Sequence, residues 1–125
     1  MPFVKNVRDL EVFKLAYQAA LEIYNITKEF PPEEKYDLTS QIRRSSKSVC
    51  GCLLEAWRRR RYPKNFVSKL NDAETEADET MMWLDFSKDL GYIDKAKYEN
   101  LYDKYDHILA MLVKMIASPE KWKVN

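Results

Sequence analysis

The segment from Gln41 to Tyr62 reads QIRRSSKSVCGCLLEAWRRRRY, and it decides how the rest of the chain packs. Its apolar and small residues recur every three or four positions, which is the period of a helix with one buried face. That face consists of Leu38, Ile42, Ser45, Val49, Cys52 and Ala56, with Leu53 beside it. Gly51 costs a helix about 1 kcal/mol relative to alanine, so we expect a closely approaching partner helix to compensate for it. The pattern predicts a core helix over residues 37–60.

The segment before it, residues 10–30, carries two apolar stripes. One stripe consists of Leu10, Phe13, Tyr17, Ala20 and Tyr24, and the other of Val12, Ala16, Ala19, Ile23 and Ile26. Asp9 can cap this helix, and Pro31 and Pro32 end it because proline cannot continue the backbone ladder. Two readings stay open for the stripes. They form either one wide face inside a single chain or a second surface that meets another subunit, for which Val12, Ala16 and Ile23 are the candidates.

Two more helices are predicted after residue 62. Pro63 suits the first position of a helix over residues 63–90, and Gly91 suits its C-terminal end. Asp94 can cap a last helix over residues 95–117. The buried seams of these two helices are Phe66, Leu70, Ala73, Ala77, Met81 and Leu84, then Tyr98, Leu101, Tyr105, Ile108, Leu112 and Met115. A second apolar patch, and a further candidate for a subunit interface, consists of Met82, Trp83 and Phe86.

Length and composition fit four helices joined by short turns. The chain has 125 residues, of which 46% are hydrophobic, and only 2 glycines, too few for the tight turns of a sheet protein. These features predict an all-α fold, an antiparallel up-and-down four-helix bundle, in one domain covering residues 1–125.

The sequence also indicates a compartment. The N-terminal residues MPFVKNVRD lack the apolar segment of a signal peptide, and no run reaches the roughly 18 apolar residues of a membrane span. Two cysteines in such a chain fit a reducing compartment. We therefore expect a cytoplasmic protein that does not enter a membrane.

Charge is unevenly distributed although the net charge is only +1. Basic residues dominate positions 38–69, where Glu55 is the only acid, and acids dominate positions 71–89, where Lys88 is the only base. The two segments either neutralise each other, within a chain or between subunits, or leave a basic surface for a polyanion. Glu55 can pair with Arg58 or Arg59 one turn away, which predicts a structural role for it.

Arginines near both ends of the 37–60 helix are the strongest functional signal. The guanidinium group offers a planar fork of donors that matches phosphate. Trp57 and Tyr62 flank the arginine run and can stack on unpaired bases. The alternative is a solvated helix end whose arginines complement the helix dipole. The candidate nucleic-acid-binding residues are Arg43, Arg44, Lys47, Arg58, Arg59, Arg60, Arg61 and Lys64.

Catalytic and metal-binding patterns are weak. His107 is the only histidine and has no evident nucleophile beside it. Cys50 and Cys52 point to different sides of a helix, so they cannot form a disulfide or chelate one metal together, and we expect Cys52 in the core and Cys50 half-buried. Di-iron bundles need Glu-x-x-His pairs, which the chain lacks. We expect no enzyme activity, no metal and no cofactor.

Several motifs together resemble one family. They are LEVFK, the turn FPPEEKYDL, QIRRS, the central serine and glutamate, and late in the chain LGYI, and they extend in order from Val7 to Ile93. This combination resembles the small four-helix-bundle proteins encoded by intervening sequences in bacterial 23S ribosomal RNA genes. At the centre the family usually has Asn-Ile-Ala-Glu-Gly, whereas this chain has Cys52-Leu53-Leu54-Glu55-Ala56 and keeps only the glutamate.

The resemblance implies an up-and-down bundle that assembles into a homo-oligomer, commonly a pentamer, and no enzyme activity. It implies RNA as a partner only through the genomic setting of the family. Two functional hypotheses therefore remain. One is a homo-oligomer that binds RNA through the arginine-rich segments, and the other is a protein-interaction scaffold whose basic helix pairs with the acidic helix of a neighbour.

Overall fold

The helices form where the sequence has a helical period between proline, glycine and aspartate boundaries. The computed structural model describes residues 5–123. Its α-helices are α1 (Glu11–Thr27), α2 (Leu38–Arg58), α3 (Pro63–Asp89) and α4 (Lys95–Ala117), and its short 3-10 helices are η1 (Val7–Asp9), η2 (Pro32–Glu34) and η3 (Pro119–Trp122). The predicted all-α class is confirmed.

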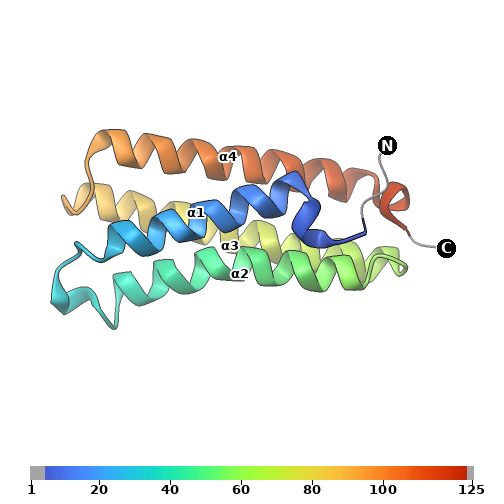
Figure 1. Ribbon diagram of the computed structural model, residues 1–125, viewed down its shortest axis with the longest axis horizontal. Helices are drawn as coiled ribbons and strands as arrows, with labels where there is room; N and C mark the ends of the chain where they lie inside the picture. Colours follow the sequence, from blue (N-terminus) through green and yellow to red (C-terminus); the bar gives the residue numbers. More distant parts are fainter. Residues whose placement is uncertain (1–4, 124–125) are drawn as a thin grey trace.

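Each α-helix runs antiparallel to the one before it (Figure 1). Within residues 5–123, α-helices contact one another only as neighbours around the ring α1–α2–α3–α4, so α2 and α4 lie on a diagonal. The segments η1 and η3 lie at the same end of the bundle as the turn between α2 and α3 (Figure 1). The architecture is the predicted antiparallel up-and-down bundle, and no helix in the described range is long and apolar enough to cross a membrane.

Most residues of the predicted seams of α2, α3 and α4 lie in the core, and the exceptions are the half-buried Cys52 and Tyr98. Phe66, Leu70 and Leu112 are fully buried, and α2 packs most extensively against α3. At the centre of that contact, the hydroxyl oxygens of Ser45 and Thr80 are 2.8 Å apart. The pair satisfies two buried polar groups with short side chains, so the helices can approach closely there.

The α1 residues predicted as a subunit interface do not lie on the surface. Val12, Ala16 and Ile23 are 3%, 0% and 0% exposed, so they belong to the core of a single chain and the prediction of a subunit interface there is wrong. The physical reason is that α1 packs against both α2 and α4, and this double contact buries most of its wide apolar face. The apolar residues that α1 leaves exposed are Tyr17, Leu21 and Tyr24.

The apolar patch near the end of α3 does lie on the surface. Met82 and Phe86 are exposed, Trp83 is half-buried, and the rings of Trp83 and Phe86 have centroids 5.8 Å apart. Their role as a subunit interface stays a prediction.

The helix ends follow their sequence signals in α3 and α4 but not in α1, which ends at Thr27, before Pro31 and Pro32. Pro63 is the first residue of α3, Gly91 has a φ of +80°, and the Asp94 carboxylate accepts a hydrogen bond of 2.8 Å from the backbone N–H of Lys97. Asp9 lies in η1 and does not cap α1, which begins after Leu10. The side chain that caps η1 is instead Asn6, whose Oδ1 accepts from the backbone N–H of Arg8.

Two predictions about the middle of α2 are also wrong. Gly51 is exposed, and among residues 5–123 no atom of another element lies within 4 Å of the position that a Cβ would occupy, so no helix of the described chain approaches it closely. Cys52 is half-buried and not in the core, because Leu53 occupies the inward position beside Val49 and Ala56. Cys50 is half-buried as predicted, and burial raises the pKa of its thiol to about 11.

Candidate nucleic-acid interface

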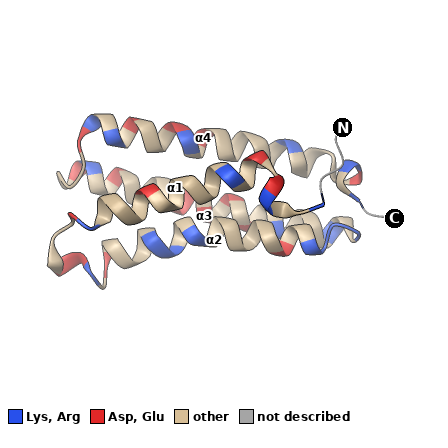
Figure 2. Cartoon of the chain, viewed as in Figure 1, with Lys and Arg blue, Asp and Glu red and all other residues tan. Residues whose placement is uncertain are grey.

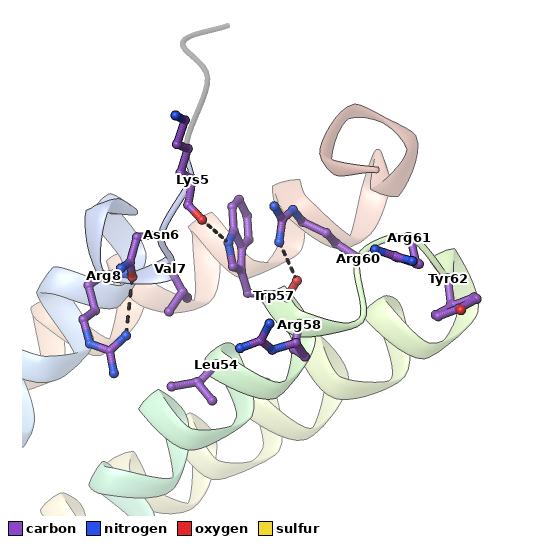
Figure 3. A pocket seen from close by; sticks show the side chains of 10 residues that line it. All are labelled: Lys5, Asn6, Val7, Arg8, Leu54, Trp57, Arg58, Arg60, Arg61 and Tyr62. Carbon is purple, nitrogen blue, oxygen red and sulfur yellow. Dashed lines mark hydrogen bonds between the residues drawn. The ribbon is translucent and has the colours of Figure 1, made fainter. Parts of the chain in front are cut away.

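The end of α2 opens onto a groove that it shares with the N-terminal segment (Figure 3). We call it the terminal groove, and its volume is about 640 Å³. Among the residues that the structure describes, none that lines it is acidic. The basic residues that line it are Lys5, Arg8, Arg58, Arg60 and Arg61, and the others are Asn6, Val7, Leu54, Trp57 and Tyr62.

Trp57 holds the two walls of the terminal groove together. Its indole N–H donates a hydrogen bond of 3.4 Å to the carbonyl oxygen of Lys5, which fastens the N-terminal segment to the end of α2 (Figure 3). Val7 is buried beside it. Trp57 therefore helps to fix the positions of Lys5 and Arg8 along the groove.

Arg60 covers the ring of Trp57. Its guanidinium carbon lies 4.1 Å from the ring centroid, and its Nη1 donates a hydrogen bond of 2.8 Å to the carbonyl oxygen of Trp57. Trp122 packs edge-on against the same ring, with centroids 5.9 Å apart. Trp57 is only 7% exposed, so the prediction that it stacks on an unpaired base is wrong. Tyr62, which is 57% exposed, remains available for such a contact.

The terminal groove carries uncompensated positive charge. Within residues 5–123, none of its five basic side chains forms an ion pair. Burial lowers the pKa of Arg60, and the charges of Arg58 and Arg61 act in the same direction. Arginine stays protonated at neutral pH despite such shifts, so the groove keeps its positive charge. Figure 2 shows basic positions gathered at the end of α2 and in the turn that follows it.

A second basic groove lies near the start of α2. We call it the α2 groove, and its volume is about 740 Å³. Its basic residues are Lys35, Arg43, Arg44 and Lys47, and the remaining lining residues are Tyr36, Thr39, Ser40, Ser48 and Gly51.

Two arginines of the α2 groove already have partners in the chain. The Nε of Arg43 donates a hydrogen bond of 2.7 Å to the Thr27 hydroxyl, and its guanidinium lies 4.2 Å from the ring centroid of Tyr24. Arg44 reaches across to α3, where its Nη2 is 3.3 Å from Glu79 and 3.7 Å from Glu76. Arg44 of the basic helix is therefore neutralised by two acids of α3 within one chain, which is one of the two readings of the charge pattern.

The contact between Arg44 and α3 leads to a prediction on pH. Burial raises the pKa of Glu76, the neighbouring Glu79 raises it further, and Arg44 opposes both. A carboxyl whose pKa is raised in the folded state loses stabilisation as pH rises through that pKa. Glu76→Gln should therefore raise the melting temperature at pH 7, and the difference from the parent chain should disappear at pH 4.

Circular dichroism at the two pH values would measure this effect. Asp78→Asn, on the exposed side of α3, is the matched control and should show no such difference. A lower melting temperature of Glu76→Gln at pH 7 would mean that the ion pair with Arg44 outweighs the cost of burial.

Three predicted site residues lie outside both grooves. Arg59 and Lys64 are exposed at the turn between α2 and α3 without lining the terminal groove. Glu55 pairs with neither Arg58 nor Arg59, because its Oε2 lies 3.0 Å from the Nζ of Lys69 on α3. This ion pair connects α2 and α3.

The structure gives His107 no catalytic setting. The ring is exposed on α4, and its Nδ1 lies 2.9 Å from the carbonyl oxygen of Asp103 on the same helix. It lines neither groove. Residues 5–123 contain no cluster of three or more histidine, cysteine, aspartate or glutamate side chains that could hold a metal ion.

Sequence reasoning missed the basic residues that come from outside α2. Lys5 and Arg8 reach the terminal groove from the N-terminal segment, and Lys35 reaches the α2 groove from the loop before α2. A weak signal was present, since Asn6 followed by Arg8 fits a capped turn. Nothing in the sequence indicated that this turn packs on Trp57.

Comparison with known proteins gives a family and a fold relative. Residues 8–114 match the model of a family described as 23S rRNA-intervening sequence protein. Among solved structures, the chain is similar to a protein of unknown function from the S23 ribosomal protein family of Bacteroides thetaiotaomicron VPI-5482. The two are 30% identical with a TM-score of 0.77, and the match covers 85% of this chain and 95% of the other. No curated protein matches.

Proposed function

This chain belongs to the family of 23S rRNA-intervening sequence proteins, and from that premise we propose that it is a non-enzymatic protein that binds RNA through the terminal groove. The observation that carries the proposal is the set of five basic side chains around one groove, none of them in an ion pair within residues 5–123. Concentrated, unpaired positive charge attracts the phosphate backbone regardless of base sequence.

The arrangement of the basic side chains fits a chain of phosphate groups better than a single small anion. Arg58 and Arg61 project from the end of α2 and the turn that follows, and Lys5 and Arg8 project from the opposite wall (Figure 3). Cations on two walls can contact successive phosphates of one backbone. Tyr62 adds one exposed ring at the rim.

The direct test is binding of an RNA hairpin across a salt series, followed by fluorescence anisotropy. If most of the five cations contact phosphate, the logarithm of the association constant should fall with the logarithm of salt concentration with a slope of about −3 to −4. No binding at low salt, or binding that salt leaves unchanged, would overturn the proposal.

A homo-oligomer is part of the same proposal. The surface that supports it is the exposed apolar patch of Met82 and Phe86 with the half-buried Trp83, because patches of this kind often mark subunit contacts. The second candidate function is the scaffold, and the contacts of Arg44 with Glu76 and Glu79 favour it, since they join a basic to an acidic helix. Those contacts lie within one chain, however, and they leave Arg58 and Arg61 free for RNA.

A further inference from the structure

The terminal groove and the α2 groove lie on one face of α2. Exposed residues recur along that helix at intervals of four and three, which keeps them on the same side. They are Ser40, Arg44, Lys47, Gly51, Leu54 and Arg58. We call this set the α2 outer face, and it joins the two grooves into one surface.

The α2 outer face is basic at both ends and neutral between them. Lys47 and Arg58 are separated by about 16 Å along the helix axis, at 1.5 Å per residue. Between them lie only Gly51 and Leu54, with Ser48 beside them. Three acids lie beside the α2 outer face: Glu55 is held to the side by its ion pair with Lys69, and Glu76 and Glu79 are paired with Arg44.

Gly51 has no explanation within the chain. A glycine in the middle of a helix costs about 1 kcal/mol relative to alanine. It has a helical conformation that any residue can adopt, and in the described part of the chain no atom of another element lies within 4 Å of the position of an added Cβ. The missing side chain therefore leaves room for something outside the chain at the middle of the α2 outer face.

We propose that the α2 outer face binds double-stranded RNA, a step that rests on the proposed function and names its substrate class. The minor groove of A-form RNA is wide and shallow and presents 2′-hydroxyl groups, and proteins recognise it by shape and by phosphate contacts on both sides. The basic groups near Lys47 and Arg58 contact the two phosphate backbones. Gly51 lets the helix approach the groove between them, where the Ser48 hydroxyl meets the 2′-hydroxyls.

Other occupants fit the surface less well. Single-stranded RNA is bound largely by stacking on aromatic rings. The exposed rings that line the two grooves, Tyr36 and Tyr62, come before Ser40 and after Arg58 in the chain, so they do not lie along the middle of the α2 outer face. A second copy of the chain that docked through this same face would bring like charges together, which opposes the contact.

The test uses Gly51→Gln and a 20-base-pair RNA duplex, with one unpaired strand of the same sequence as the competing ligand. The parent chain should bind the duplex more tightly than the single strand, and Gly51→Gln should weaken duplex binding about tenfold. The matched control is Ala110→Gln, which adds the same side chain to the exposed side of the diagonal helix α4 and should bind as the parent does. Lys47→Gln, which removes a cation without filling space, should weaken duplex binding severalfold.

The outcomes separate this inference from the proposed function. If the parent chain binds no RNA at all, the proposed function fails and this inference fails with it. If it binds RNA through Arg58 and Arg61 but prefers the single strand, or if Gly51→Gln and Lys47→Gln bind duplex like the parent, only this inference is overturned. A changed molecular mass of Gly51→Gln would assign the face to contact between copies and would also overturn it.

Discussion

Replacing Arg58 and Arg61 together with glutamine is expected to raise the dissociation constant for an RNA hairpin about a hundredfold. Both side chains line the terminal groove and neither forms an ion pair among the described residues, so their removal changes little in the fold. A charge-assisted hydrogen bond is worth roughly 1.5 kcal/mol, and two of them correspond to that factor. The magnitude of the salt slope should decrease by about 2, which is about 1 for each phosphate contact that is lost.

The chain offers a matched control in the same turn. Arg59→Gln with Lys64→Gln removes the same charge from exposed positions outside the groove. Its affinity should stay within about threefold of the parent chain, because neither side chain lines the groove and exposed charge outside it is screened at physiological salt. Equal losses in the two double variants would show that RNA responds to overall charge and not to the groove. A drop in molecular mass of Arg58→Gln/Arg61→Gln by light scattering would instead support the scaffold.

Trp57→Ala is expected to lower the free energy of unfolding by about 3–5 kcal/mol, the usual cost of deleting a buried aromatic ring. The ring is 7% exposed and contacts Trp122, the guanidinium of Arg60 and the backbone of Lys5. Such a loss is large against the 5–15 kcal/mol that stabilises a typical domain. Urea unfolding followed by circular dichroism would measure it.

The same substitution should weaken RNA binding, because Lys5 and Arg8 lose their anchor to α2. Trp57→Phe is the control, since it keeps an apolar ring and removes only the N–H that donates to the Lys5 carbonyl oxygen. It should cost about 1–2 kcal/mol, from one lost hydrogen bond and a slightly smaller ring. A loss below 1 kcal/mol for Trp57→Ala would mean that the N-terminal segment and η3 do not pack on this ring in solution.

Much of the architecture could be predicted because it depends on local patterns. Each helix has a buried seam with a period of three and four, and each turn has a proline, glycine or aspartate whose conformational effect is local. Pro63, Gly91 and Asp94 all lie where those effects place them. The start of α1 was missed because the cap belongs to η1, a short element with no periodic signal.

Burial on α1 and α2 was harder to predict. A sequence with two apolar stripes does not say how many neighbours a helix has, and α1 buries Val12, Ala16 and Ile23 because α2 and α4 both pack on it. The predictions for Gly51 and Cys52 were wrong for a related reason. Small residues are compatible with a close helix contact, but the rotation of α2 about its axis decides whether a partner is there, and that rotation depends on the whole core.

The candidate site divides in the same way. The sequence by itself determined that α2 carries arginines near both ends, because the composition of one helix is visible in one segment. Only the tertiary structure decided that Arg44 is neutralised by Glu76 and Glu79, while Arg58 and Arg61 line one groove together with Lys5 and Arg8. Local periodicity fixes which side chains share a helix face, whereas the partners of each charge come from segments far apart in the chain, and only packing brings those segments together.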